Sequence, residues 1–326
     1  LDKLMQISLK NRLIVLLDQG EADDDLSRIV ALDAEDGHRV WDTARETPNS
    51  WTTPIVIEYQ GRPQIVTATD PWVIAYDPEN GEEIWRADVL VGDVAPSPVY
   101  AGGMVIACSD GADLVAIRPD GEGDVTETHV VWSAPGSMPD TSSPVSDGTN
   151  VYVVASFGLM TAFRLTDGEQ VWSEELPDGM YYSSPAVVGD RIWLMNREGV
   201  MHFFATGSDF RHLGSASLGE AADATPAFVD GSVFIRGAEH LFRIGAPKQE
   251  PVAQAAEPAD EDRAAEGEGS ETGGAGEAPA QDSPFDATPA QTNGGGTEQV
   301  EEQATPSAPS GEEDTEDETE QEDVGF

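Results

Sequence analysis

Short apolar segments recur along the first three quarters of the chain, and polar turns rich in Gly, Asp and Asn separate them. Residues 151–154 and 192–194 are two examples, and both are rich in β-branched or aromatic side chains, which favours strands over helices. Several of the turns end in glycine, as in Glu35-Asp36-Gly37, because glycine accepts the positive φ that tight turns need. The pattern predicts an all-β chain of many short strands.

Two sequence markers repeat with the same period of about 40 to 47 residues. One marker is a small or hydroxyl residue before proline, and the other is an apolar residue before tryptophan. Because two independent markers keep step, the chain contains a true internal repeat. The first marker is found at Pro54, Pro98, Pro144, Pro185 and Pro226. The second marker is found at Trp41, Trp85, Trp132 and Trp172.

Each repeat unit predicts four strands. The first strand follows the proline, where the missing N–H breaks no hydrogen bond of a sheet. The third carries a small Ala, and the fourth carries the Trp, so a large and a small side chain are expected to pack where units stack. The structural residues of the repeat are therefore predicted to be the four tryptophans and the turn glycines Gly37, Gly81 and Gly168.

Six units are recognisable. The first covers about residues 5–43 and lacks a clear proline marker. In the fifth, Leu213 stands where the tryptophan is expected, and the sixth is short, ending near residue 245 without a fourth-strand tryptophan. Four-stranded units at this period predict the blades of a β-propeller, in which each blade buries its faces against its neighbours.

At these residues the sequence resembles the PQQ-like β-propeller repeat family, which includes BamB-like outer-membrane assembly lipoproteins and quinoprotein alcohol dehydrogenases. The repeat of that family is approximately Ala-x-Asp-x-x-Thr-Gly-x-x-x-Trp. Ala31, Asp33, Gly37 and Trp41 match it, with Asp36 in the Thr position. The unit that begins at Ala75 matches at the same four positions, and the unit at Ala162 has Arg164 in place of the Asp. The unit at Ala116 departs further, with an insertion before its tryptophan. The resemblance implies seven or eight blades, so N-terminal blades are expected to be missing.

Composition changes near residue 246. Residues 247–326 carry 23 acidic against 2 basic residues and only two aromatic ones, so they are predicted to form a disordered acidic tail after the propeller of residues 1–246. This tail is expected to be a solvating segment or an electrostatic arm. The whole chain has a net charge of −45, which argues against a nucleic acid partner, and no apolar run is long enough to span a membrane.

The sequence offers little for catalysis. The resemblance implies that a quinoprotein enzyme would hold PQQ with calcium, and often a vicinal disulfide, but Cys108 is the single cysteine and is predicted to be an inert core thiol. Asp23-Asp24-Asp25 with Glu21 is interpreted as a solvated loop rather than a calcium loop. The five histidines show no paired ligand spacing, so neither a catalytic residue nor a metal site is predicted.

One set of residues is a candidate binding site. The loop that leads into each first strand should open at one face of the propeller, and aromatic side chains there favour contact with a protein or peptide. The alternative is that these rings pack against neighbouring blades. The candidate residues, about three before the marker prolines, are Trp51, Tyr181, Tyr182 and Asp223.

The resulting hypothesis is a non-catalytic, protein-binding scaffold. The resemblance implies an extracytoplasmic location, in the periplasm, at the outer membrane or secreted. Two alternatives remain open at this point, a PQQ- and calcium-dependent dehydrogenase and a ligand-sensing propeller domain of a larger protein.

Overall fold

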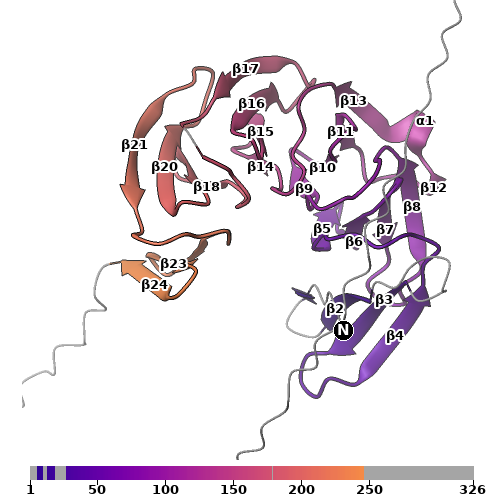
Figure 1. Cartoon of the computed structure of the whole chain (residues 1–326). Coiled ribbons are helices and arrows are strands. Elements are labelled where there is room, and N and C mark those ends of the chain that lie inside the picture. Colours follow the sequence, from indigo (N-terminus) through magenta and orange to yellow (C-terminus); the bar gives the residue numbers. More distant parts are fainter. Residues whose placement is uncertain (1–5, 10–12, 19–26, 178, 246–326) are drawn as a thin grey trace, which may run out of the picture. The chain divides into compact units, whose positions relative to one another are not determined.

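The computed structural model describes residues 6–9, 13–18, 27–177 and 179–245. Every described element lies within Leu1–Ala253, the first of two units into which the chain divides. The described strands form six sheets, one for each predicted repeat, and they follow one another in sequence order (Figure 1). The predicted tail at 247–326 and the acidic loop at residues 21–25 lie outside the described residues, so the domain boundary and the tail stay predictions.

Sheets A, B and C come from the first half of the described chain. Sheet A contains β1 (Gln6–Leu9), β2 (Leu13–Asp18), β3 (Arg28–Asp33) and β4 (Arg39–Ala44). Sheet B contains β5 (Ile55–Tyr59), β6 (Arg62–Ala68), β7 (Trp72–Tyr76), β8 (Glu83–Asp88) and β12 (Gly123–Asp124). Sheet C contains β9 (Val99–Ala101), β10 (Met104–Ala107), β11 (Leu114–Ile117) and β13 (Val130–Ala134).

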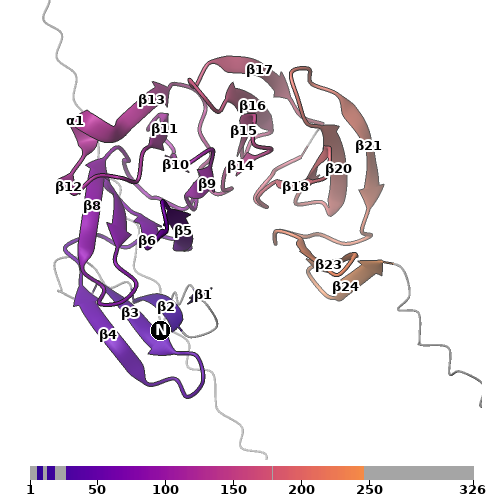
Figure 2. The same cartoon turned by 180° about the vertical axis from the view of Figure 1, so that it is seen from behind.

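Sheets D, E and F complete the set, and Figure 2 shows the same order from behind. Sheet D contains β14 (Val145–Ser146), β15 (Asn150–Ala155), β16 (Leu159–Arg164) and β17 (Gln170–Glu175). Sheet E contains β18 (Ala186–Val188), β19 (Arg191–Met195), β20 (Val200–Ala205) and β21 (His212–Ser217). Sheet F contains β22 (Ala227–Val229), β23 (Ser232–Arg236) and β24 (Leu241–Gly245), so the short sixth repeat has three described strands.

The insertion before Trp132 has a definite structure. Its strand β12 pairs in parallel with β8 of the preceding sheet, Gly123 lying opposite Trp85. The four-residue helix α1 (Thr126–His129) follows directly. Val125, between the two, is buried in the core between sheets B and C. The extra residues therefore tie sheet C to the outer edge of sheet B.

The core lies between the sheets rather than within one of them. Five separate apolar clusters each join one sheet to the next, from A with B to E with F. Side chains alternate between the two faces of a strand, so neighbouring residues serve different clusters. Val151 faces sheet C and Tyr152 faces sheet E, for example. Cys108 is buried in the cluster between C and D, where burial raises the pKa of its thiol to about 12.

The repeat tryptophans cross these boundaries. Trp41 and Trp132 each pack against a turn of the next sheet. A Cβ atom on Gly81 would come within 2.5 Å of the Trp41 indole, and a Cβ atom on Gly168 would come within 2.6 Å of the Trp132 indole. Both glycines also have a positive φ, +73° and +72°. The turn glycine is thus required twice, by its own backbone and by its neighbour's ring. The indole N–H donates to a carbonyl of that next turn in the pairs Trp41–Pro78, Trp132–Leu165 and Trp172–Gly207.

Trp85 reaches the next sheet through an intermediary. Its indole N–H donates to Gln64 Oε1 (2.9 Å), and Gln64 Nε2 donates to the carbonyl of Pro119 (2.8 Å), which lies in the corresponding turn of sheet C. Gln64 is buried on β6, so its amide satisfies both groups away from water. This relay occurs beside the turn that the insertion lengthens.

Sheet E corrects one sequence interpretation. In sheets A to D the repeat Trp lies opposite the small Ala, followed by a register shift. In sheet E the residue pair before the equivalent shift is Phe203 and Gly214. Gly214, not Leu213, therefore occupies the tryptophan position. The large and small residues have exchanged strands, which preserves the pairing of a large side chain with a small one.

The marker before each proline has a structural cause. The prolines directly precede the first strands of sheets B to F, and the residue before each proline supplies a hydroxyl group. In sheets C to F, that hydroxyl accepts a hydrogen bond from the equivalent backbone N–H of the preceding sheet, at 2.8 to 3.0 Å. The resulting chain of bonds runs from Thr53 to Ser97, Ser143, Ser184 and Thr225.

Candidate functional site

Two of the predicted rim residues meet at an arginine. Tyr182 and Asp223 lie in the lead-in loops, the segments that connect the last strand of one sheet to the first strand of the next. Arg197 lies between β19 and β20. Its guanidinium carbon is 4.4 Å from the centroid of the Tyr182 ring, and its Nε donates to Asp223 Oδ1 at 2.7 Å. Asp223 raises the pKa of Arg197, so the cation is held between an aromatic face and a carboxylate.

The backbone holds this arginine in place. Arg197 N–H donates to the carbonyl of Met180 (2.8 Å), and Ala222 N–H donates to the carbonyl of Arg197 (3.2 Å). The loop is thus bonded on one side to the lead-in loop of sheet E and on the other to that of sheet F. Because both neighbours are fixed by their own strands, the side chain of Arg197 is presented from an ordered support.

Exposed apolar side chains lie next to this cluster. Met180 is 38% exposed and precedes Tyr181, whose N–H donates to the carbonyl of Ser156. Phe157, the residue after Ser156, is 64% exposed and borders a cavity of about 390 Å³. We call the set the lead-in surface. It consists of Phe157, Met180, Tyr182, Arg197 and Asp223.

The other two rim candidates have different surroundings. Tyr181 is fully buried between sheets D and E, and its hydroxyl donates to the carbonyl of Pro177 at 2.7 Å. Its environment matches the packing alternative. Trp51 is half-buried in the lead-in loop of sheet B, and its N–H donates to the carbonyl of Val94 in the next lead-in loop. Trp51 occupies the lead-in loop of sheet B, whereas Tyr182 and Asp223 belong to those of sheets E and F. A binding role for Trp51 stays a prediction.

Sequence reasoning missed Arg197, Phe157 and Met180. The repeat alignment considered only residues before the prolines, whereas Arg197 and Phe157 come from loops between the second and third strands. In an antiparallel four-stranded unit those loops lie at the same end as the lead-in loops. Aligning both sets of loops would have placed Arg197 beside Tyr182.

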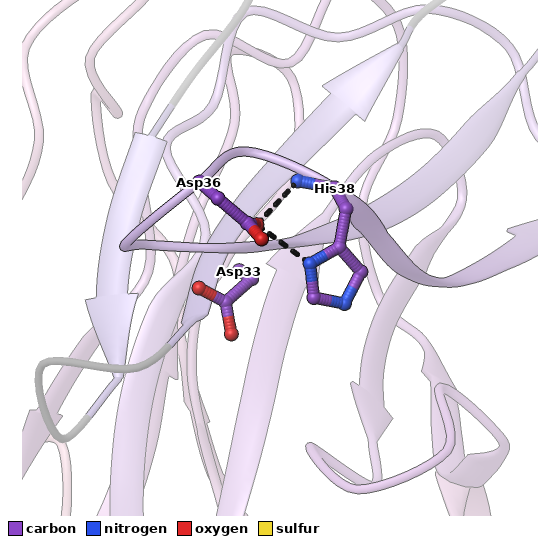
Figure 3. A group of neighbouring side chains, drawn as sticks. All are labelled: Asp33, Asp36 and His38. Atoms are coloured by element: carbon purple, nitrogen blue, oxygen red, sulfur yellow. Dashed lines mark hydrogen bonds and ion pairs between the residues drawn. The ribbon is translucent and has the colours of Figure 1, made fainter.

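Two groups of acidic and histidine side chains have ligand atoms close enough together to hold a metal ion. In the first, Asp36 Oδ1 accepts from both the backbone N–H and the ring Nδ1 of His38, at 3.0 and 2.6 Å (Figure 3). These bonds lower the pKa of Asp36 and raise that of His38. Asp33 Oδ1 accepts from the N–H of Glu35 (2.8 Å). The carboxylates therefore serve the turn between β3 and β4.

The carboxylate of the second group also accepts hydrogen bonds from a turn of the chain. Glu220 Oε1 accepts from the N–H groups of Glu239 (3.1 Å) and His240 (2.9 Å), and its Oε2 contacts His240 Nδ1 at 2.8 Å. These hydrogen bonds lower the pKa of Glu220. Glu220 thus fastens the lead-in loop of sheet F to the turn before β24. We assign no metal to either group.

A polar cavity of about 590 Å³ lies at the opposite end of sheets D and E. Its carboxylate Asp147 already accepts from the N–H groups of Thr149 and Asn150 and from the hydroxyl of Tyr152, at 2.6 to 2.8 Å. Arg164, also in the wall, is paired with acidic residues of its own turn. These polar groups are satisfied within the chain.

Comparison with known proteins identifies the family. Residues 25–176 and 123–212, which together cover more than half of the chain, match the family described as outer membrane protein assembly factor BamB. The chain belongs to this family. Its fold is an all-β propeller of PQQ-like repeats, as predicted.

Individual relatives support the same assignment. The outer membrane protein assembly factors BamB of Alkalilimnicola ehrlichii and Bordetella pertussis are each 24% identical, over 47% and 61% of this chain. The matches span 40% and 52% of those relatives, about half their length or less. The crystal structure of BamB from Moraxella catarrhalis matches with a TM-score of 0.57 and 17% identity, covering 72% of this chain and 70% of that one. The described part of this BamB-family chain contains no helix of the length and apolarity needed to cross a membrane.

Proposed function

We propose that this chain is a non-catalytic scaffold of the cell envelope that binds proteins during outer-membrane protein assembly. Membership of the BamB family carries the proposal, because the relatives are named as assembly factors. The lead-in surface supplies a binding site, since it combines an aromatic ring, an arginine and exposed apolar side chains. Such residues dominate the binding energy of protein interfaces.

The proposed partner is an extended, apolar segment of a membrane β-barrel protein before it folds. Phe157 and Met180 would contact its apolar side chains, and Arg197 would contact acidic or aromatic ones. An extracytoplasmic location follows from this role and is part of the proposal. Nucleic acid is not a proposed partner, because the net charge of −45 would repel its phosphates.

Binding to a defined client tests the proposal. A fluorescently labelled outer-membrane β-barrel protein, unfolded in urea and then diluted, is titrated with the chain, and the Kd is measured by anisotropy. Tyr182→Ala and Arg197→Ala should each weaken binding about 10-fold or more, because each removes a central contact. Arg164→Ala, at the opposite end of sheet D, is the matched control and should leave the Kd unchanged.

Two results would contradict this assignment of the site. One is equal affinity of the parent and both variants, and the other is a large fall in melting temperature in Tyr182→Ala, which would give the ring a packing role. The Trp51→Ala variant extends the test to the fourth rim candidate. Absence of any client binding by the parent chain would remove the scaffold proposal itself.

The absence of a cofactor is also part of the proposal. The competing function is a dehydrogenase that holds PQQ with calcium, and it is tested by titrating PQQ and Ca²⁺ while following absorbance and dye-linked alcohol oxidation. We expect neither saturable binding nor turnover. Turnover would replace the scaffold proposal with an enzymatic one.

A further inference from the structure

Arg45 is a buried cation without an anionic partner among the described residues. It follows β4 directly, and only 5% of its surface is exposed. Its Nε donates to the hydroxyl of Tyr76 at 3.1 Å, and its Nη2 lies 3.5 Å from the hydroxyl of Thr67. Its Nη1 is buried and has no hydrogen-bond acceptor among the described residues. The side-chain acceptors that the described residues offer to this positive charge are thus two neutral hydroxyl groups.

The contrast with other arginines makes this arrangement unusual. The chain has 62 acidic residues, and Arg28, Arg86 and Arg197 each form an ion pair although they are more exposed than Arg45. None of the ion pairs between described residues includes Arg45. Burial of an uncompensated charge carries a large desolvation penalty.

Further hydrogen-bond donors lie beside it. The backbone N–H of Arg45 donates to the carbonyl of Ser27 (2.8 Å). The hydroxyl groups of Ser27 and Thr47 are 3.4 Å apart, and both residues are buried. At most one of the two hydroxyl protons serves the bond between them. Guanidinium N–H groups and hydroxyl groups are the kinds of donor from which an anion accepts hydrogen bonds.

We propose that Arg45 holds a small inorganic anion, chloride in the cell, between sheets A and B. The burial of the residue decides the size of the ligand, because a peptide carboxylate or a lipid phosphate on a larger molecule could not reach Nη1. The anion neutralises the guanidinium, whose other nitrogens contact Thr67 and Tyr76 of sheet B. Its binding would stabilise the folded chain by RT ln(1 + c/Kd), where c is the chloride concentration, a free energy that keeps rising with c.

Two measurements on the full chain test the proposal. Melting temperature is recorded while sodium chloride replaces sodium gluconate at constant ionic strength. It should rise with chloride, following the logarithm of the chloride concentration above the Kd, and the rise should be lost in Arg45→Gln. The matched control is Arg197→Gln, which removes an exposed, ion-paired arginine and should keep the full chloride response.

A direct observation covers the case in which Arg45→Gln does not fold. Crystals of the parent chain soaked in sodium bromide should show an anomalous peak within hydrogen-bond distance of Arg45 Nη1, because bromide replaces chloride. Identical melting in chloride and gluconate, with no bromide peak at Arg45, would overturn the proposal. A carboxylate of the chain seen seated against Nη1 would overturn it as well.

Discussion

At the scale of single residues, burial moves the pKa of His202 away from the value that is usual for a histidine. The residue is 5% exposed, and its ring centroid lies 6.0 Å from that of Tyr181 and 6.2 Å from that of Phe204. Its Nδ1 is 3.4 Å from His212 Nε2, and its own Nε2 is buried without a hydrogen-bond partner in the part of the chain that the structure describes. Burial first, and then the nearby charge of His212, lower the pKa of His202.

This lowered pKa predicts a loss of stability in mild acid. The unfolded chain binds a proton at His202 near the ordinary pKa of 6.5, whereas the folded chain resists it, so the unfolded state holds more protons as pH falls. The contribution of His202 is complete above about pH 6.5 and is lost below it. Urea unfolding at about pH 7.5, 6.5 and 5.5 should show a falling free energy of unfolding that His202→Gln flattens.

His38 provides the control for this experiment. Asp36 raises the pKa of His38, so its titration has the opposite sign, and its contribution is lost as pH rises. His38→Gln should therefore not flatten the loss of stability in acid. An unchanged pH slope in His202→Gln would show that burial of this ring does not control the titration.

At the scale of secondary-structure elements, the turn between the third and fourth strands is the part that joins one sheet to the next. In sheets A, B and D the repeat glycine of this turn has a positive φ, a conformation that other residues rarely adopt. In sheet B it is required again, because Gly81 lies under the Trp41 ring of sheet A. Gly37, at the same position in sheet A, has a similar φ of +76° but open space where a Cβ would be. Substitutions at the two glycines therefore separate the effect of backbone conformation on stability from the effect of packing against the indole.

Alanine substitutions at these two positions predict different costs. Gly37→Ala should destabilise the fold by about 1 kcal/mol through its backbone conformation alone. Gly81→Ala should cost about 1 to 3 kcal/mol more, because its methyl group would displace the Trp41 ring. Equilibrium urea unfolding measures both values. Equal costs would mean that the turn moves away from the indole without penalty.

At the scale of the whole described region, separate interfaces replace a single core. The five apolar clusters share no common centre, so cooperation between distant sheets depends on contacts repeated at every boundary. The bonds from each backbone N–H to the next hydroxyl are such contacts, and they link sheets B to F in one series. Loss of one hydroxyl should loosen one boundary.

Ser143→Ala tests this series. The substitution leaves the N–H of Ser97 without its acceptor at 3.0 Å, so we expect a loss of about 1 to 2 kcal/mol in the free energy of unfolding. Hydrogen exchange should accelerate most at the amide of Ser97. Ser208→Ala, which removes a hydroxyl bonded only to the adjacent Asp209 in the described structure, should change neither measurement.

Sequence reasoning predicted the elements better than their contacts. The prolines located the starts of five first strands, and the spacing of the tryptophans located the fourth strands of sheets A to D. The exchange of Phe203 and Gly214 was missed because a longer turn shifts the register of β21. Of the candidate rim residues, Tyr182 and Asp223 both contact Arg197 while Tyr181 is buried, and a binding role for them stays a prediction.

The sequence by itself determined the repeat, the all-β class and the positions of the turns. These features depend on local rules, such as the alternation of side chains along a strand and the conformational freedom of glycine, which a single segment expresses. Only the tertiary structure decided which carbonyl each indole meets and that Arg197 lies between Tyr182 and Asp223. It also decided that Arg45 is buried without an ion-pair partner among the described residues. These contacts join residues of different strands or different repeats, so they depend on how sheets stack and not on the order of nearby residues.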